Sequence, residues 1–234
     1  MFIIELFGLP SVGKTTNSYL IGEKLKQNGS ILYTQIDYIS FIKKSHFFTK
    51  LTVVFQNVWT FLRCISLLKW NGFTLISSYF YSIKLTFKIL VKAQYLSIMA
   101  NCFRKNHPNQ RQTLILDQNL LQHIWSISMK NGITDLEKFI DLVHSRLNAK
   151  VNILYLVRSV EDCTDSLILR SHGDSYLDNK PRAFVYNELL KGETCCNKIY
   201  KHASRKSKIF GDIVTDIDQL ILKTNIISNT KLND

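Results

Sequence analysis

Residues 8–16 have the types and the spacing of a loop that binds a phosphate chain. They read Gly-Leu-Pro-Ser-Val-Gly-Lys-Thr-Thr, which matches the pattern G-x-x-x-x-G-K-[ST]. Gly8 and Gly13 allow backbone angles that other residues avoid, so successive backbone N–H groups can turn toward one anion. Lys14 would then reach the β- and γ-phosphates of a nucleoside triphosphate, and the Thr15 hydroxyl would bind Mg²⁺. The residues that we expect to contact the nucleotide are Gly8, Ser11, Val12, Gly13, Lys14, Thr15 and Thr16.

The segments on both sides of this loop are the ones that such a site requires. Residues 2–7 are an apolar run suited to a buried strand, and the segment after the loop has the pattern of a helix. The positive end of that helix would point at the bound phosphates. A chance match, in which the glycines only form a turn between a strand and a helix, is the alternative. Because both flanks agree with the motif, we predict that the chain binds a nucleoside triphosphate.

Two aspartates follow predicted strands, where α/β proteins gather their ligands. Asp37 follows the apolar run 31–36, and its carboxylate would orient or deprotonate a phosphate acceptor. A helix cap is the equally weighted alternative for Asp37. Asp117 ends the apolar run that begins at Gln112. Its carboxylate would hold Mg²⁺ opposite Thr15, directly or through water.

A basic, glycine-containing loop is expected at residues 170–182, after a fourth strand at 151–157 and a helix. Such a loop can close cations over a transferred phosphoryl group and offset the charge that develops there. Arg170 is the cation that we assign to this role, assisted by Arg182. An ordinary basic surface loop is the alternative.

The segment 38–116 contains no Asp or Glu, although it holds eleven Lys and Arg and 15 of the 27 aromatic residues. We expect two or three helices inserted at residues 38–111. This insertion could grip an anionic acceptor, lie on an anionic membrane surface, dock an acidic partner or nucleic acid, or pair with a second copy of the chain. Nucleic acid is the least expected of these partners. The alternative is a solvated lysine face over a helical core.

Length and composition favour a single α/β domain that spans residues 1–234 and ends in a polar tail at 228–234. The five cysteines form no C-x-x-C pair, which is typical of reduced thiols. We find no signal peptide, and lysines interrupt the most apolar segment, so no transmembrane segment is expected. These features predict a cytoplasmic protein. The chain also lacks the N-K-x-D motif of GTPases and the L-S-G-G-Q motif of transporter ATPases.

Taken together, the P-loop, the strand that ends at Asp117 and the arginine-bearing loop resemble the P-loop nucleoside and nucleotide kinase superfamily, its thymidylate-kinase-like members above all. Residues 116–122, Leu-Asp-Gln-Asn-Leu-Leu-Gln, resemble a segment of ATP-binding proteins in that group. The resemblance implies a P-loop NTPase fold, with a five-stranded parallel sheet of order 2-3-1-4-5 and helices on both faces. It also implies that residues 38–111 bind the acceptor and that residues 170–182 form the lid.

The chain departs from this family pattern at the lid. Leu167 stands where the first of two lid arginines is expected, and Tyr176 stands where an arginine is common. No DRY-like triplet follows Asp117, which argues against thymidylate as the acceptor. The function that we predict is transfer of the γ-phosphoryl group of Mg²⁺-ATP to a nucleotide, a nucleoside or another small acceptor. The alternative is an ATP-binding regulatory or assembly protein that hydrolyses ATP slowly and docks through its basic helices.

Overall fold

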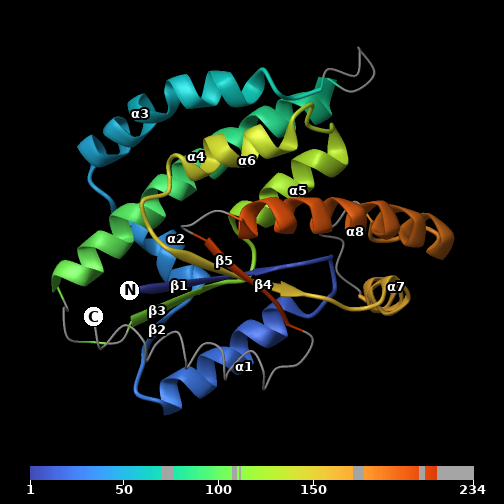
Figure 1. Cartoon of the computed structure of the whole chain (residues 1–234), viewed down its shortest axis with the longest axis horizontal. Coiled ribbons are helices and arrows are strands. Elements are labelled where there is room, and N and C mark those ends of the chain that lie inside the picture. Colours follow the sequence, from blue (N-terminus) through green and yellow to red (C-terminus); the bar gives the residue numbers. More distant parts are fainter. Residues whose placement is uncertain (70–75, 107–109, 111, 171–176, 206–208, 215–234) are drawn as a thin grey trace.

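A computed structural model describes residues 1–69, 76–106, 110, 112–170, 177–205 and 209–214. Its centre is a parallel sheet with the strand order β2-β3-β1-β4-β5, which confirms the predicted order (Figure 1). The five strands are β1 (Phe2–Phe7), β2 (Ile31–Tyr33), β3 (Gln112–Leu116), β4 (Val151–Leu156) and β5 (Ile209–Val214).

The central strand β1 carries the P-loop at its carboxyl end. β1 pairs with β3 on one side, where Phe2 lies opposite Thr113, and with β4 on the other, where Ile4 lies opposite Asn152. All residues of β3 and β4 and five of the six in β1 are buried. Near-continuous apolar runs are typical of strands that helices cover on both faces. The loop after β1 therefore lies at the middle of the sheet edge.

Helices cover both faces of the sheet. Figure 1 shows α1 along one side, with α4, α5, α6 and α8 on the opposite side and α3 on the outside of that layer. The helices are α1 (Lys14–Gln27), α2 (Gln35–Lys44), α3 (Phe47–Ile65), α4 (Ile76–Asn106), α5 (Leu120–Lys130), α6 (Leu136–His144), α7 (Val160–Ile168) and α8 (Arg182–Ser204).

The predicted helical insertion at 38–111 consists of most of α2, together with α3 and α4. α4 buries residues such as Ile89 and Leu96 and packs against both α3 and α5. On α4, Lys84 and Lys88 are exposed, but Lys92 of the same four-residue series is buried. The idea of a solvated lysine face therefore fails at Lys92.

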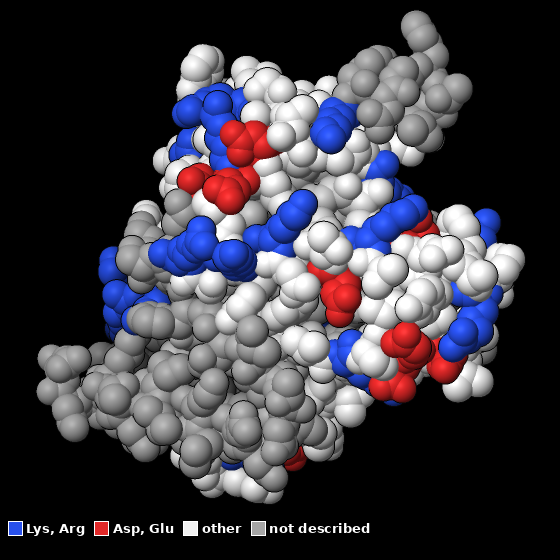
Figure 2. Space-filling model, turned by 45° about the vertical axis from the view of Figure 1, so that its right-hand side comes forward, with Lys and Arg blue, Asp and Glu red and all other residues white. Residues whose placement is uncertain are grey.

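Several further features bear on the sequence predictions. The strand expected at 31–36 is shorter, because β2 ends at Tyr33 and α2 begins at Gln35. The five cysteines are free thiols. Within the described ranges, no helix is long and apolar enough to cross a membrane. Lys and Arg occupy more of the surface shown in Figure 2 than Asp and Glu do, in keeping with the formal net charge of +12. The predicted polar tail at 228–234 lies outside the described residues.

Candidate active site

The loop between β1 and α1 has the backbone geometry that its motif requires. Gly8 has a φ of +153°, and a Cβ atom at this position would lie 2.6 Å from the carbonyl oxygen of Leu156 at the end of β4. Only glycine lets the loop pass the end of β4 this closely. Gly13, with a φ of +94°, is the N-cap of α1, so the positive end of the helix faces the loop. The Ser11 hydroxyl is buried and has no hydrogen-bond partner among the residues the structure describes.

The ammonium group of Lys14 lies inside the curve of this loop. Nζ donates hydrogen bonds to the carbonyl oxygens of Gly8, at 3.0 Å, and Leu9, at 2.6 Å. The residue is only 8% exposed, and burial lowers the pKa of its ammonium group to about 8. The group therefore remains mostly protonated at pH 7. It places a positive charge at the mouth of the loop, as the motif predicts.

The structure brings together Thr15 and Asp117, which lie 102 residues apart in the sequence. Oγ1 of Thr15 donates a hydrogen bond to Oδ2 of Asp117 at 3.0 Å. The two residues meet because β3, which Asp117 follows, pairs with β1, which leads to the loop. A hydroxyl and a carboxylate are the hard oxygen donors that Mg²⁺ prefers. The pair fits the predicted metal site, and Mg²⁺ binding there stays a prediction.

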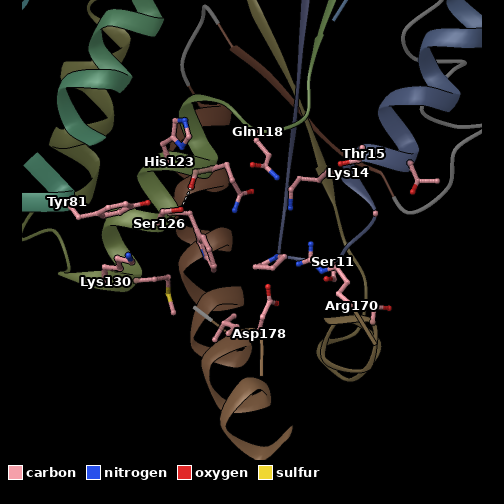
Figure 3. Close-up of a pocket in the computed structure, with 18 residues that line it drawn as sticks. Ser11, Lys14, Thr15, Tyr81, Gln118, His123, Ser126, Lys130, Arg170 and Asp178 are labelled. Carbon is pink, nitrogen blue, oxygen red and sulfur yellow. Dashed lines mark hydrogen bonds between the residues drawn. The ribbon is translucent and has the colours of Figure 1, made fainter. Parts of the chain in front are cut away.

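A cavity of about 740 Å³ joins the P-loop to the wall formed by α5. Figure 3 shows Ser11 and Lys14 on one side of it, with His123 and Ser126 of α5 and Tyr81 of α4 across from them. A volume of this size holds a drug-sized ligand. The cavity thus has room for the terminal part of a nucleotide and a second small molecule.

The two arginines assigned to the lid have different positions. Arg170 follows α7 and lines the cavity, where Figure 3 shows it beside the P-loop. Arg182, the first residue of α8, instead donates from Nε to Oδ1 of Asp165 at 2.9 Å on the surface, and it does not line the cavity. The structure brings Arg170 to the site and leaves Arg182 outside it. The middle of the predicted lid, 171–176, lies outside the described residues.

The prediction that Asp37 ends a strand and faces the acceptor is wrong as to its position. Asp37 lies in the first turn of α2, where Oδ2 accepts hydrogen bonds from the backbone N–H of Thr34, at 2.7 Å, and from its hydroxyl, at 2.8 Å. This is a capping box. Among the residues described, Asp37 does not line the cavity. The capping alternative therefore holds, with Asp37 at the third helical position and Thr34 at the N-cap.

Sequence reasoning missed a buried pair behind the α5 wall. Nζ of Lys92, which is 7% exposed, lies 3.0 Å from Nε2 of His123, which lines the cavity. Burial lowers the pKa of Lys92 to about 8. Burial and the charge of Lys92 lower the pKa of His123 to about 3. At pH 7 a neutral imidazole therefore accepts a hydrogen bond from an ammonium group, and a positive charge lies directly behind the cavity wall.

Glu5 on β1 is a second missed group. It is 1% exposed, and burial raises the pKa of its carboxyl group to about 7. Oε1 accepts a hydrogen bond from the backbone N–H of Leu121 at 2.7 Å, in the first turn of α5. An acceptor at a helix N-terminus satisfies an otherwise unpaired backbone donor. Glu5 therefore joins the strand that carries the P-loop to the helix that forms the opposite wall.

Two more residues complete this wall. The indole Nε1 of Trp125 donates to the backbone oxygen of Gly192 in α8 at 3.0 Å, which fixes the ring at the cavity. Gln122, 8% exposed, also lines the cavity, and its Oε1 is buried with no hydrogen-bond partner in the described part of the chain. A buried unpaired amide oxygen is costly unless a ligand supplies a donor. The wall therefore contains one buried amide oxygen without a partner among the described residues, beside the polar side chains of His123 and Ser126 that line the cavity.

Comparisons with known proteins agree with the fold. A deoxyadenosine kinase from M. mycoides, solved with the products dCMP and a flexible dCDP, is similar with a TM-score of 0.51 and 16% identity over 97% of this chain and 100% of that one. A deoxyadenosine kinase structure from the same source with bound dATP gives a TM-score of 0.43 and 16% identity over the whole of both chains. No protein-family model matches, and a comparison with curated protein sequences gives no match. Strand order, loop geometry and the first of these likenesses together show that the chain has the P-loop NTPase fold, which it shares with this kinase structure.

Proposed function

We propose that this protein is a kinase that transfers the γ-phosphoryl group of Mg²⁺-ATP to a nucleoside, a nucleotide or another small acceptor. The observation that carries the proposal is a cavity of about 740 Å³ in which the P-loop faces α5. A fold shared with a deoxyadenosine kinase supports the same reaction class. Both substrates of a kinase must meet in one such space for direct transfer.

On the nucleotide side, the backbone N–H groups of the loop and Lys14 would bind the phosphates. Thr15 and Asp117 would hold Mg²⁺, which supplies charge neutralisation at the β- and γ-phosphate oxygens when it is bound. Arg170 would offset the negative charge that develops on the transferred group. The chain thus supplies one cation from the loop and one from the segment after α7.

On the acceptor side, Trp125 offers an aromatic wall, and Gln122 lines the cavity, where its side-chain amide would bind an N–H or O–H group of the acceptor. Asp178 is the one carboxylate among the described residues that line the cavity. Phosphoryl transfer depends mainly on positioning and electrostatic stabilisation, so a strong base is not required. The acceptor side is therefore built for holding a small molecule with donor groups.

The experiment that tests this proposal measures ADP release from Mg²⁺-ATP by the purified protein. The assay is run alone and with pools of nucleosides, nucleoside monophosphates and phosphorylated metabolites, and the products are examined for transferred phosphate. We expect one pool to raise ADP release and to gain phosphate. The Gln122→Ala variant should raise the KM for the acceptor with little change in the affinity for ATP, because Gln122 lies on the α5 side of the cavity.

A second candidate function, an ATP-binding regulatory protein with slow hydrolysis, also has an observation in its favour. A single arginine, Arg170, lines the cavity among the described residues, although two lid arginines are expected from the family resemblance. The same assay separates the two functions. Tight ATP binding without acceptor-stimulated ADP release in any pool would reject the kinase proposal and favour the regulatory protein.

A further inference from the structure

The outward face of α3 is apolar along its whole length. α3 lies on the outside of the helical layer, where it packs on α4 and α6 (Figure 1). Four of its aromatic side chains are 69–79% exposed. The exposed apolar residues follow helical spacing and share one face: Phe47, Phe48, Leu51, Val54, Phe55, Val58, Trp59 and Leu62. We call these eight residues the α3 apolar face.

The opposite side of α3 holds polar residues that are fixed by hydrogen bonds inside the protein. Asn57 is fully buried, and its Nδ2 contacts Oε1 of Gln94 in α4 at 2.5 Å. Thr60 is 3% exposed, and its hydroxyl accepts from Nε of Arg146 at 2.8 Å. These bonds determine which way α3 faces. The inward side of α3 therefore mixes these polar residues with the buried Val53 and Cys64, while its outward side is apolar, where an ordinary surface helix is polar.

The α3 apolar face is a continuous patch and not a set of isolated exposed residues. An aromatic side chain presents about 150–250 Å². At their exposure, the four aromatic residues alone leave roughly 500 Å² uncovered, at the upper end of the apolar patches found on monomeric proteins. Patches of this kind mark sites of interaction with a protein or a membrane.

The charges around this face decide between those two partners. At 100° per residue, Lys50 and Arg63 lie on opposite flanks of the apolar arc, and Lys43 and Lys44 end the preceding helix. Residues 38–116 contain no Asp or Glu. A second copy of the chain would bring cations against cations, with no carboxylate from this segment to pair with them. An anionic surface complements the same flanks.

We propose that α3 docks this protein on an anionic lipid bilayer. The α3 apolar face enters the boundary between headgroups and acyl chains, and Lys50, Arg63 and the end of α2 contact the lipid phosphates. Aromatic and aliphatic residues on one side with flanking Lys and Arg are the composition of helices that lie in the membrane interface. The proposal does not depend on the kinase activity, since it concerns a different surface of the molecule.

The test measures binding of the full-length protein to sedimented vesicles of phosphatidylcholine, with and without phosphatidylglycerol, at low and high salt. We expect binding to be at least about tenfold tighter with phosphatidylglycerol and to weaken with salt, because salt screens the lysines. A triple variant, Phe48→Ser, Phe55→Ser and Trp59→Ser, should lose at least about tenfold in affinity. Tyr19→Ser, which changes an exposed aromatic residue on α1, is the matched control and should bind as the wild type does.

Two further measurements make the outcome decisive. Circular dichroism establishes that the triple variant is folded, and Trp fluorescence should shift to shorter wavelength with anionic vesicles in the wild type but much less in Trp59→Phe. Equal binding to both vesicle types, or no binding, would overturn the proposal. A dimer in sedimentation equilibrium that the triple variant dissociates would also overturn it, because a second copy would then be the partner of this face.

Discussion

The ammonium group of Lys92 and the imidazole of His123 form a buried hydrogen-bonded contact of 3.0 Å between α4 and α5. Glu5 on β1 supplies the nearby opposite charge, since its carboxylate and Lys92 interact electrostatically. Ionisable groups on three separate elements therefore meet between the P-loop strand and the α5 wall of the cavity. Burial raises the pKa of Glu5 and lowers those of Lys92 and His123, and each change favours the neutral form of the group.

The first prediction concerns pH and stability. The pKa of Glu5 is raised from 4.5 to about 7, so the folded state holds a proton that the unfolded state has lost between these values. Glu5 therefore contributes about 3 kcal/mol to the free energy of unfolding. This contribution is complete below pH 4.5 and is lost as the pH rises through 7. His123 acts in the opposite sense, since its pKa is lowered from 6.5 to about 3. Its contribution is complete above pH 6.5 and is lost as the pH falls through 3.

Between pH 4.5 and 6.5, Glu5 makes the free energy of unfolding fall with pH, whereas His123 makes it rise. We expect Glu5→Gln to leave the His123 slope alone, so that the urea-derived free energy of unfolding rises with pH across this window. His123→Gln should give the reverse, a free energy that falls between pH 4.5 and 7. A Glu5→Gln variant with the pH profile of the wild type would contradict the assignment of this slope to Glu5.

The second prediction concerns Lys14. Replacing it by Met removes the ammonium group that would bind the phosphates, and we expect ATP affinity to fall by at least about 100-fold, as for the loss of charge-assisted hydrogen bonds. The free energy of unfolding should change little, because the loss of the hydrogen bonds to Gly8 and Leu9 offsets the relief from burying a charge. Isothermal titration with ATP and thermal unfolding measure both effects. Lys26→Met, on the exposed side of the same helix, is the control and should bind ATP normally.

The third prediction concerns the hydroxyl of Thr15. Thr15→Val keeps the shape of the side chain but cannot donate to Asp117 or bind a metal, and we expect ATP turnover to fall about 100-fold at saturating Mg²⁺. Thr15→Ser retains the hydroxyl and should keep most of the activity. Titrating Mg²⁺ in the turnover assay separates a weaker metal site from a lost chemical step. Equal activity of the Val and Ser variants would exclude the hydroxyl as a ligand.

The fourth prediction compares two arginines. Arg170→Ala should lower kcat by about 100-fold or more, because the residue lines the cavity and would stabilise the transferred charge. Arg182→Ala should change kcat little, since the exposed ion pair with Asp165 contributes at most about 1 kcal/mol to stability. Steady-state kinetics with the acceptor from the pool assay measure both. Comparable losses in the two variants would show that Arg182 reaches the substrates during turnover.

The fifth prediction concerns Asp37. Asp37→Ala breaks the capping box with Thr34, and we expect the free energy of unfolding to fall by about 1 kcal/mol. The kcat of the variant should remain within about twofold of the wild type. Denaturant unfolding and turnover are measured on the same preparation. A variant with unchanged stability and strongly reduced kcat would restore the role of Asp37 as the base.

Whether the role of a residue could be predicted from the sequence depended on how far along the chain its contact residues lie. The P-loop is a local signal, because Gly8 and Gly13 satisfy backbone demands within nine residues. Asp37 was ambiguous, since the apolar run 31–36 competes with a capping signal that begins at Thr34 and leaves Ile36 78% exposed. The packing of α4 on α5 brings Lys92 to His123.

Contacts of that kind leave no trace in local periodicity. Glu5 and Leu121 lie 116 residues apart, and only the pairing of β1 with β3 brings the following helix onto the strand. Arg182 donates a hydrogen bond to Asp165, 17 residues earlier, and does not line the cavity. A motif search does not detect such a contact. The motif therefore predicted the loop and the family resemblance predicted the sheet, whereas the charges behind the α5 wall required the folded structure.

The hydrogen bonds from Lys14 to Gly8 and Leu9 also have a consequence for how a ligand arrives. The ammonium group neutralises the carbonyl oxygens that would otherwise repel an incoming phosphate, and it holds the loop in its curved form before any ligand binds. The entropy of ordering the loop has then already been lost during folding. A phosphate chain would therefore meet a preorganised receptor, and we expect its recognition at this loop to be closer to lock-and-key than to induced fit.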